Sequence, residues 1–386
     1  MNQLYNTQKD FSNNISNFLK EAIPNIRKSQ LKIIPNILLG MILSESVVAH
    51  DISLELKNDF CKIQHDSVIK RIRRFFKNKL FDPYTFYDAI ISYVIYHYKK
   101  KHNDKRVHIT FDHMFSHNNY TVFMITMRVG KQGIPLWFRC FKGKEGPDAY
   151  EEELLKQGIS YVSNLFGKDF DLIFLADRWF NSTTLLQHIQ SLGHTFCIRL
   201  KRNIKALVYN QKEGHHIWYF LDALPSYKYH SKCYEGIYLT ESKFQTNLVI
   251  SKSIDVSEPW IIVTNGNPRR AIKDYGYRFG SIESLFKCQK SNGFNLEKTV
   301  NASLKYFESM YTIACFAHLF LTIIAADYSK NTKNYRNVKF TTHTKNKNNG
   351  LVRLISLFQL GLTLFKRAFN SSCYIKISYR FILYDI

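Results

Sequence analysis

One segment late in the chain combines a single carboxylate with several cations and a tyrosine. Glu283, Lys287 and Lys290 are spaced i, i+4 and i+7, so a helix presents all three on one face. Tyr275 and Arg278 stand a few residues before it. A carboxylate among basic groups is what a site requires if it holds a metal ion and grips a phosphate backbone. An ordinary amphipathic helix with an exposed ion-pair face has the same pattern, so this segment alone does not decide between them.

Two aspartates upstream could supply further ligands. Asp112 ends an alternating segment at residues 107–112, which is typical of a strand, and Asp177 ends the apolar run at residues 170–177. Taken singly, such an aspartate is more often a cap or turn residue. If the two strands are neighbours in a mixed sheet, however, the carboxylates come within reach of one ion, and Glu283 is the natural third ligand.

Three carboxylates without His or Cys form a set of hard oxygen ligands. Such a set suits Mg²⁺, for which Mn²⁺ can substitute. Two such ions can activate a water or a sugar hydroxyl and stabilise the leaving oxygen in an in-line attack on a phosphodiester. Asp112, Asp177 and Glu283 are therefore the candidate catalytic and metal-binding residues, and the chemistry is the cutting or joining of nucleic acid strands.

The charge of the chain points to the same class of partner. Its 386 residues carry a formal net charge of +23, which implies a polyanion, most often nucleic acid and less often an anionic membrane. A composition rich in Lys and Asn from an AT-rich genome explains part of this excess. The hydrophobic content of 45% excludes a disordered chain.

Cysteines and apolar runs narrow the cellular setting. The seven cysteines stand singly, with no CxxC pair and no His partners at zinc-site spacing, so neither a disulfide framework nor a zinc site is expected. The first residues lack the pattern of a signal peptide. The apolar run at residues 310–326 contains His318 and favours a buried helix over a membrane span. A reducing cytosol fits the unpaired cysteines.

Residues 1–104 are predicted to be a helical DNA-binding domain. Asp66 can cap a helix whose apolar residues face a core and whose Lys70, Arg71 and Arg74 are exposed. A basic helix after shorter helices suggests docking on DNA in the manner of a helix-turn-helix. A merely solvated basic face is equally compatible with the pattern.

Residues 105–328 are predicted to be an α/β core interrupted by an insertion. Strands are expected at residues 107–112, 120–129 and 134–141, then a helix at 148–166, a strand at 170–177, a helix at 182–192 and a strand at 195–200. This order is that of a ribonuclease-H-like mixed-sheet core. Residues 105–200 form its first part, 201–258 a β-rich insertion and 259–328 its second part. Residues 329–386 are expected to be a basic linker and a C-terminal helix at 351–369.

The segment around Glu283 is expected to be a loop that feeds a helix. Gly280 and Ser281 favour a helix start after Gly280, with Ser281 as its cap. Tyr275 and Arg278 then lie on the loop before the helix, and a helix running unbroken through Arg278 would put Arg278 and Glu283 on different faces.

These residues resemble the DDE transposases of bacterial insertion sequences, in the IS-four-like group with a Tyr-Arg-Glu-Lys signature. Tyr275 and Arg278 keep its first spacing, and Glu283 and Lys290 its last, while four residues instead of three separate Arg278 from Glu283. Residues 177–180, Asp-Arg-Trp-Phe, match the family's Asp-Arg-Gly-Phe at three of four places, and Asp112 fits by strand context.

The resemblance implies a homodimer that pairs two element ends, cuts them through a hairpin intermediate and joins them to target DNA. Its partners would be duplexes carrying terminal inverted repeats and the target duplex. It also implies that Tyr275, Arg278 and Lys290 contact phosphates beside the cut, and that Trp179, Phe279 or Trp260 stacks on an extruded base. Further candidate DNA-binding residues are Lys287, Arg178, Lys70, Arg71 and Arg74. The alternative is a non-catalytic or inactivated DNA-binding protein derived from such an element, and a related nuclease that only cuts is a third possibility.

Overall fold

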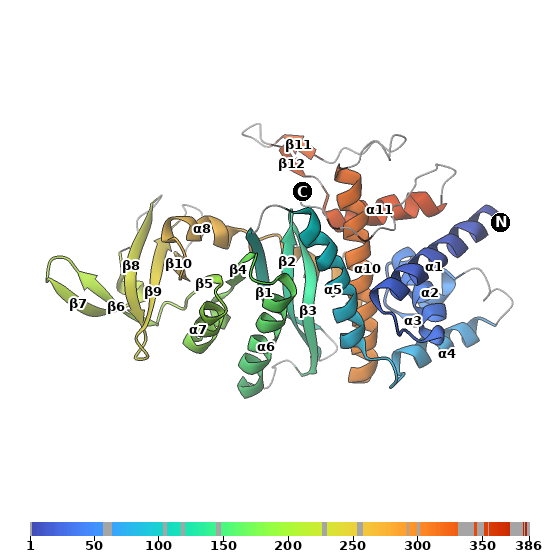
Figure 1. Cartoon of the computed structure of the whole chain (residues 1–386), viewed down its shortest axis with the longest axis horizontal. Helices are drawn as coiled ribbons and strands as arrows, with labels where there is room; N and C mark the ends of the chain where they lie inside the picture. Colours follow the sequence, from blue (N-terminus) through green and yellow to red (C-terminus); the bar gives the residue numbers. More distant parts are fainter. Residues whose placement is uncertain are drawn as a thin grey trace.

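A broad mixed β-sheet runs through the protein, with helices at both ends of the chain (Figure 1). The computed structural model describes residues 2–56, 64–102, 106–116, 120–143, 148–225, 230–252, 258–291, 293–298, 302–330, 343–345, 351–353, 355–370, 381 and 383. The strands of this sheet are β1 (Arg106–Ser116), β2 (Tyr120–Val129), β3 (Gln132–Lys142), β4 (Asp171–Ala176), β5 (Thr195–Arg199), β6 (Lys205–Asn210), β7 (His215–Phe220), β8 (Ser231–Leu239), β9 (Phe244–Ser251) and β10 (Trp260–Thr264).

The strand order is β3-β2-β1-β4-β5-β10-β9-β8-β6-β7. β1, β4 and β5 pair in parallel, whereas the pairs on either side of them are antiparallel. The predicted mixed α/β architecture is thus confirmed. The segment predicted as a β-rich insertion supplies β6 to β9, which extend the same sheet past β10 (Figure 1). The division of the chain into domains stays a prediction.

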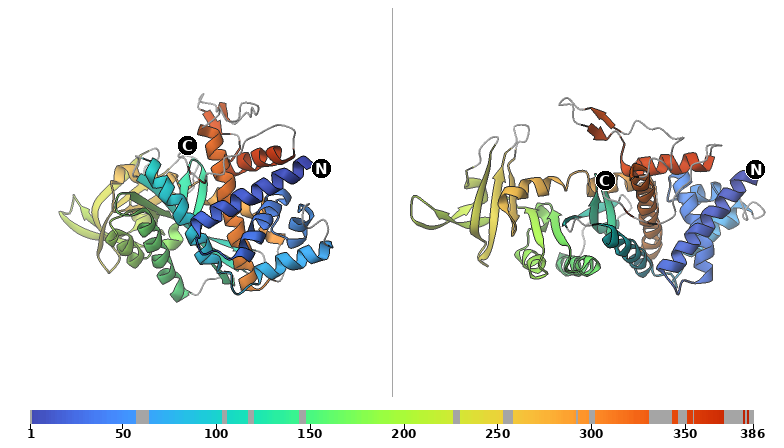
Figure 2. Two further views of the ribbon diagram at one scale, coloured as in Figure 1. Left: turned by 45° about the vertical axis from the view of Figure 1, so that its right-hand side comes forward. Right: turned by 45° about the horizontal axis from the view of Figure 1, so that its top comes forward.

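The middle of the sheet is covered on both faces. Along β4, Leu172 and Phe174 join the main core, to which α6 (Asp148–Phe166) and α7 (Thr183–Ser191) also contribute. Ile173 and Leu175 point to the opposite face and pack with residues of α8 (Pro268–Gly276). The two green helices α6 and α7 lie side by side on one side of the sheet in the right-hand view of Figure 2. Burial on both faces explains why β4 is an unbroken apolar run.

A helical layer adjoins the β3 edge. It consists of α1 (Asn2–Ala22), α2 (Lys28–Ser44), α3 (Ala49–Leu54), α4 (His65–Phe76), α5 (Pro83–Lys101), α10 (Leu304–Lys330) and α11 (Leu357–Asn370). α10 lies at its centre and contacts β3, α2, α4, α5 and α11. By length and composition α10 could cross a membrane, but its most apolar window is 100% buried within the protein. It is therefore the buried core helix expected from the sequence.

The basic helix forms as predicted, with a different start. Lys70, Arg71 and Arg74 are exposed on α4, opposite its apolar face. Asp66 is not its cap: the capping position is Gln64, and Asp66 lies in the first turn. A carboxylate there still interacts favourably with the helix dipole.

The C-terminal region differs from the prediction. The helix expected at residues 351–369 begins only at Leu357, because residues 351–353 form β12 (Leu351–Arg353), which pairs with β11 (His343–Lys345). Most of the polar tract at residues 330–349 lies outside the described residues. Among the described residues there are also three short 3-10 helices, η1 (Arg178–Phe180), η2 (Leu221–Ala223) and η3 (Leu296–Lys298).

Candidate active site

Asp112 and Asp177 lie level with each other on neighbouring strands. β1 and β4 pair in parallel, and the last paired position sets Thr110 opposite Leu175. Two residues further along this register, Asp112 comes opposite Asp177. The prediction that their strands are neighbours is confirmed. The prediction that Asp112 ends its strand is wrong, because β1 continues to Ser116 by pairing with β2 after β4 has ended.

One face of β1 meets the C-terminal part of α8 and the segment that joins α8 to α9 (Ile282–Lys290). Alternate residues of a strand point to the same face, and here every second residue from 108 to 112 makes a contact. The pairs are His108 with Asp274 at 3.1 Å, Thr110 with Ser281 at 3.3 Å and Asp112 with Arg278 at 2.6 Å. The strand therefore fixes where this segment crosses the sheet.

Arg278 brings the three candidate carboxylates together. Its guanidinium nitrogens lie 2.6 Å from Asp112 Oδ2, 3.9 Å from Asp177 Oδ2 and 3.2 Å from Glu283 Oε1. The Arg278 side chain is only 7% exposed, whereas that of Glu283 is 52% exposed, so the cluster opens to solvent on the side of Glu283. Residues 166 positions apart in the sequence thus share one charged group.

The charges of this cluster perturb one another. Burial raises the pKa of the Asp112 carboxyl, and the Arg278 guanidinium opposes that rise. Burial alone would lower the pKa of Arg278, but Asp112 and the other nearby acids outweigh it and raise that pKa. When all four groups are ionised, three carboxylates and one guanidinium leave a formal charge of −2. An excess of negative charge in so basic a protein marks a place for a further cation.

A sharp turn delivers Arg278 to the carboxylates. α8 ends at Gly276, Gly280 has φ +76°, and α9 begins at Ile282, so the predicted helix start after Gly280 is confirmed. Glycine adopts this left-handed backbone without the penalty that a Cβ brings. Tyr275 does not lie on a loop as expected, because it belongs to α8. Ser281 does not cap α9 through its side chain, since its hydroxyl contacts Thr110 instead.

α8 itself was missed in the sequence. Asn267 accepts a hydrogen bond from the Arg269 backbone N–H, and Pro268 occupies the first turn. Asn followed by Pro is a helix-start signal that could have revealed α8.

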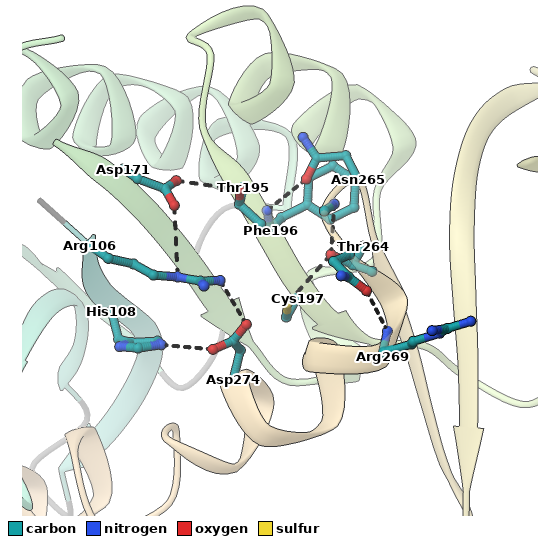
Figure 3. Close-up of polar contacts among 12 residues, drawn as sticks. Arg106, His108, Asp171, Thr195, Phe196, Cys197, Thr264, Asn265, Arg269 and Asp274 are labelled. Atoms are coloured by element: carbon teal, nitrogen blue, oxygen red, sulfur yellow. Dashed lines mark hydrogen bonds and ion pairs between the residues drawn. The ribbon is translucent and has the colours of Figure 1, made fainter. Parts of the chain in front are cut away.

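An ion-pair network centred on the buried Asp274 ties α8 to the sheet (Figure 3). Asp274, only 4% exposed, accepts hydrogen bonds from Arg106 at 2.9 Å and from His108 at 3.1 Å. Arg106 also lies 3.7 Å from Asp171 at the start of β4. These positioning residues were not predicted, although polar residues alternating along β1 before Asp112 were a signal. They hold α8, and with it the turn that carries Arg278.

Arg178 and Trp179 follow Asp177 on η1. The Asp177 carboxylate accepts a hydrogen bond from the Arg178 backbone N–H at 2.6 Å and so caps this turn. The Arg178 side chain pairs with Glu258 at 3.3 Å, and Arg199 of β5 pairs with the same carboxylate at 3.3 Å. Trp179 is 67% exposed.

The aromatic residues after β9 pack against one another. Trp260 and Phe279 stack with ring centroids 5.2 Å apart and an interplanar angle of 15°. Tyr275 meets Trp260 edge to face at 5.3 Å and is 1% exposed, and burial raises its pKa to about 12. The ring of Tyr275 thus has a packing role in this structure, and its contact with a phosphate stays a prediction.

The remaining candidate DNA-binding residues are not part of the cluster. Lys287 and Lys290 share α9 with Glu283, and Lys290 lies about 10 Å further along the helix axis. Figure 1 places α4, which carries Lys70, Arg71 and Arg74, at the opposite end of the molecule from β6 and β7, with β1 and β4 between them.

The cluster fits a divalent metal ion in the kind of its donors. All three acids offer hard oxygens, which Mg²⁺ prefers. Within the described residues, however, no three His, Cys, Asp or Glu side chains stand close enough together to hold one metal ion. The guanidinium of Arg278 lies between the carboxylates. Its Nε is buried and has no hydrogen-bond partner among the described residues. A metal ion between the acids therefore requires this guanidinium to give way.

Comparisons with known proteins place few constraints on these residues. No protein-family model and no curated protein sequence matches the chain. Among solved structures, a piggyBac transposase synaptic complex with hairpin DNA is similar over 94% of this chain and 78% of that one, with 14% identity and a TM-score of 0.47. A Marinitoga piezophila Argonaute in complex with guide RNA and target DNA is similar over 61% of this chain and 34% of that one, with 13% identity and a TM-score of 0.20. Both scores are too low to fix fold or function.

Proposed function

We propose that the protein is a DNA transposase that cuts and joins phosphodiester bonds at Asp112, Asp177 and Glu283. One observation carries the proposal. The carboxylates of Asp112, Asp177 and Glu283 converge on the single guanidinium of Arg278, beside the C-terminal end of β4. One guanidinium does not balance three carboxylates, and a divalent cation would neutralise the remaining negative charge.

The order of the first five strands supports the proposal. β3-β2-β1-β4-β5, with β2 antiparallel to β1 and with β4 and β5 parallel to it, is the order expected of a ribonuclease-H-like core. The acids lie at the end of the parallel pairing, where ligands of open α/β sheets bind. The Tyr275, Arg278, Glu283 and Lys290 signature adds the resemblance to the IS-four-like group.

Each residue has a role in this proposal. Asp112, Asp177 and Glu283 would hold Mg²⁺, which supplies an activated oxygen nucleophile and stabilises the leaving oxygen. The Arg278 guanidinium holds the acids together until it turns to a DNA phosphate, for which its planar fork is suited. Lys287 and Lys290 continue the line of positive charge along α9.

The wider assembly is part of the same proposal. The exposed cations of α4 would bind the element-end duplex, and a homodimer would pair two ends before a hairpin forms and the ends join target DNA. We place this activity in the bacterial cytoplasm. An inactivated DNA-binding protein would keep the basic surfaces and lack the metal-dependent step.

Product analysis tests the proposal. The purified chain is incubated with labelled DNA from either side of its own gene, with Mg²⁺ or with EDTA. Nicks, hairpins and joined products that require Mg²⁺ are expected. Binding without any cleavage would identify the non-catalytic alternative, and nicks that never lead to joined strands would identify a nuclease.

A further inference from the structure

A basic hollow adjoins the carboxylates on the side away from β1. It has a volume of about 320 Å³ and is lined by Arg178, Lys201, Arg202 and Asn203. Arg178 follows β4, and the other three residues form the turn between β5 and β6. All four side chains are exposed, so the hollow is open to a partner from solution.

The hollow and the acids lie side by side at the C-terminal ends of the parallel strands. The parallel register of β4 and β5 sets Ala176 opposite Ile198, which continues to Asp177 opposite Arg199. Asp112, Asp177 and Arg199 thus come level on three adjacent strands. A DNA strand that runs past these strand ends from β1 toward β5 passes from the carboxylates directly to the cations.

An exposed aromatic ring lies beside the hollow. The Lys201 Nζ lies 5.5 Å from the centroid of the Trp179 ring, and Trp179 is 67% exposed. Trp260 and Phe279 stack on each other and are less exposed than Trp179, since Phe279 is 40% exposed and Trp260 is half-buried. Trp179 therefore offers the largest open ring surface of the three to a base, with Lys201 beside it for the phosphate.

Glu258 fixes the cations without neutralising them. Its single carboxylate pairs with both Arg178 and Arg199 at 3.3 Å, so it orients two guanidiniums with one negative charge. With Lys201 and Arg202 included, four cations and one acid leave a formal charge of +3. A hollow with this charge selects a polyanion.

We infer that this hollow binds one nucleotide of a single-stranded DNA segment next to the cut, with its base on Trp179 and its phosphate on Lys201 and Arg202. The inference rests on the proposed function, since it names where the strand leaves the carboxylates. Stacking accepts any base, so the hollow binds single strands with little sequence preference.

Fluorescence binding tests the inference with the full chain. The probe is a DNA duplex with a short single-stranded overhang that carries 2-aminopurine, and a blunt duplex serves as reference. Trp179→Ala should weaken overhang binding about tenfold or more and remove the quenching of the probe. Trp218→Ala is the matched control, because Trp218 of β7 is also exposed, at 41%.

A second pair of variants separates the hollow from overall charge. Lys201→Ala/Arg202→Ala and Lys212→Ala/Lys243→Ala both remove two positive charges from exposed turns. The first pair should lose overhang affinity and reduce its salt dependence by about one to two phosphate contacts, and the control pair should lose little of either. Equal losses in both pairs, or wild-type quenching in Trp179→Ala, would overturn the inference.

Cleavage keeps this test apart from that of the proposed function. A wild-type chain that cleaves DNA, with all variants binding the overhang alike, contradicts the hollow alone. A chain that binds the overhang through Trp179 but never cleaves supports the hollow and contradicts the transposase proposal.

Discussion

The centre of α10 and the cluster of Asp112, Asp177 and Glu283 around Arg278 both contain buried polar groups, but these groups differ in charge. In α10, His318 Nε2 lies 3.2 Å from Gln132 and 3.1 Å from the carbonyl oxygen of Gly133, and burial lowers its pKa to about 3. In the cluster, by contrast, the nearby acids raise the pKa of the Arg278 guanidinium. The core keeps its histidine neutral, even though His318 Nδ1 and Gln132 Oε1 have no hydrogen-bond partner within the described residues, whereas the cluster keeps its groups charged. We therefore expect substitutions in the core to affect stability, and those in the cluster to affect activity.

The largest effect should be on catalysis. Asp177→Asn keeps the shape of the side chain but loses the charge that a metal ion needs, so cleavage should fall by about a thousandfold. The melting temperature should stay close to that of the wild type, because the substitution also removes like-charge repulsion with Asp112. The measurement is the single-turnover cleavage rate alongside a thermal melt.

Glu213→Gln is the control for this variant, since Glu213 is exposed in the turn between β6 and β7. It should cleave at the wild-type rate. An unfolded Asp177→Asn protein would instead show that the cluster holds the fold together.

A glycine in the helical layer should give the opposite result. An added Cβ at Gly361 of α11 would stand 1.9 Å from the Leu321 carbonyl oxygen of α10, so Gly361→Ala must push the two helices apart. The cost should be about 3 kcal/mol of unfolding free energy, measured by denaturant titration, with little change in the cleavage rate of the folded fraction.

Gly276→Ala is its counterpart, since a Cβ there meets nothing within 4 Å. It should leave stability unchanged or slightly higher. Equal losses in the two alanine variants would mean that the contact between α10 and α11 is not as close as described.

His318 predicts an effect on stability that appears only at low pH. Its pKa is about 3 in the folded protein against an ordinary value of 6.5, so below pH 6.5 the unfolded chain binds the extra proton. The stability that this neutral histidine contributes is present above pH 6.5 and is lost as the pH falls toward 3, by about 3 kcal/mol at pH 4. Denaturant titrations at pH 7 and pH 4 should show a smaller difference in His318→Gln than in the wild type. The same difference in unfolding free energy between pH 7 and pH 4 in both proteins would assign the acid sensitivity to other groups.

The sequence predicted best what local pattern encodes. The apolar run before Asp177 became β4, and Gly280 marked the start of α9, because burial and backbone preference act over a few residues. Asp112 was misplaced at a strand end, since residues 113–116 belong to β1 through their pairing with the next strand, β2, which the alternating pattern of residues 107–112 does not show.

The spacing of residues in the sequence could not predict the contacts of Arg278. The signature suggested a phosphate contact for this residue, whereas here it bridges three acids, one of them 166 positions away. The hollow beside Trp179 was likewise hidden, because Lys201 and Arg202 meet η1 only when β4 and β5 pair.

Binding of Mn²⁺ tests the central claim most directly, because it asks whether the acids around Arg278 are a cation site. Titration calorimetry would compare the wild type, Arg278→Gln and the triple variant Asp112→Asn/Asp177→Asn/Glu283→Gln. We predict that the wild type binds Mn²⁺, that Arg278→Gln binds it more tightly because no guanidinium competes, and that the triple variant loses this binding. Equal Mn²⁺ affinity in all three proteins would contradict the claim.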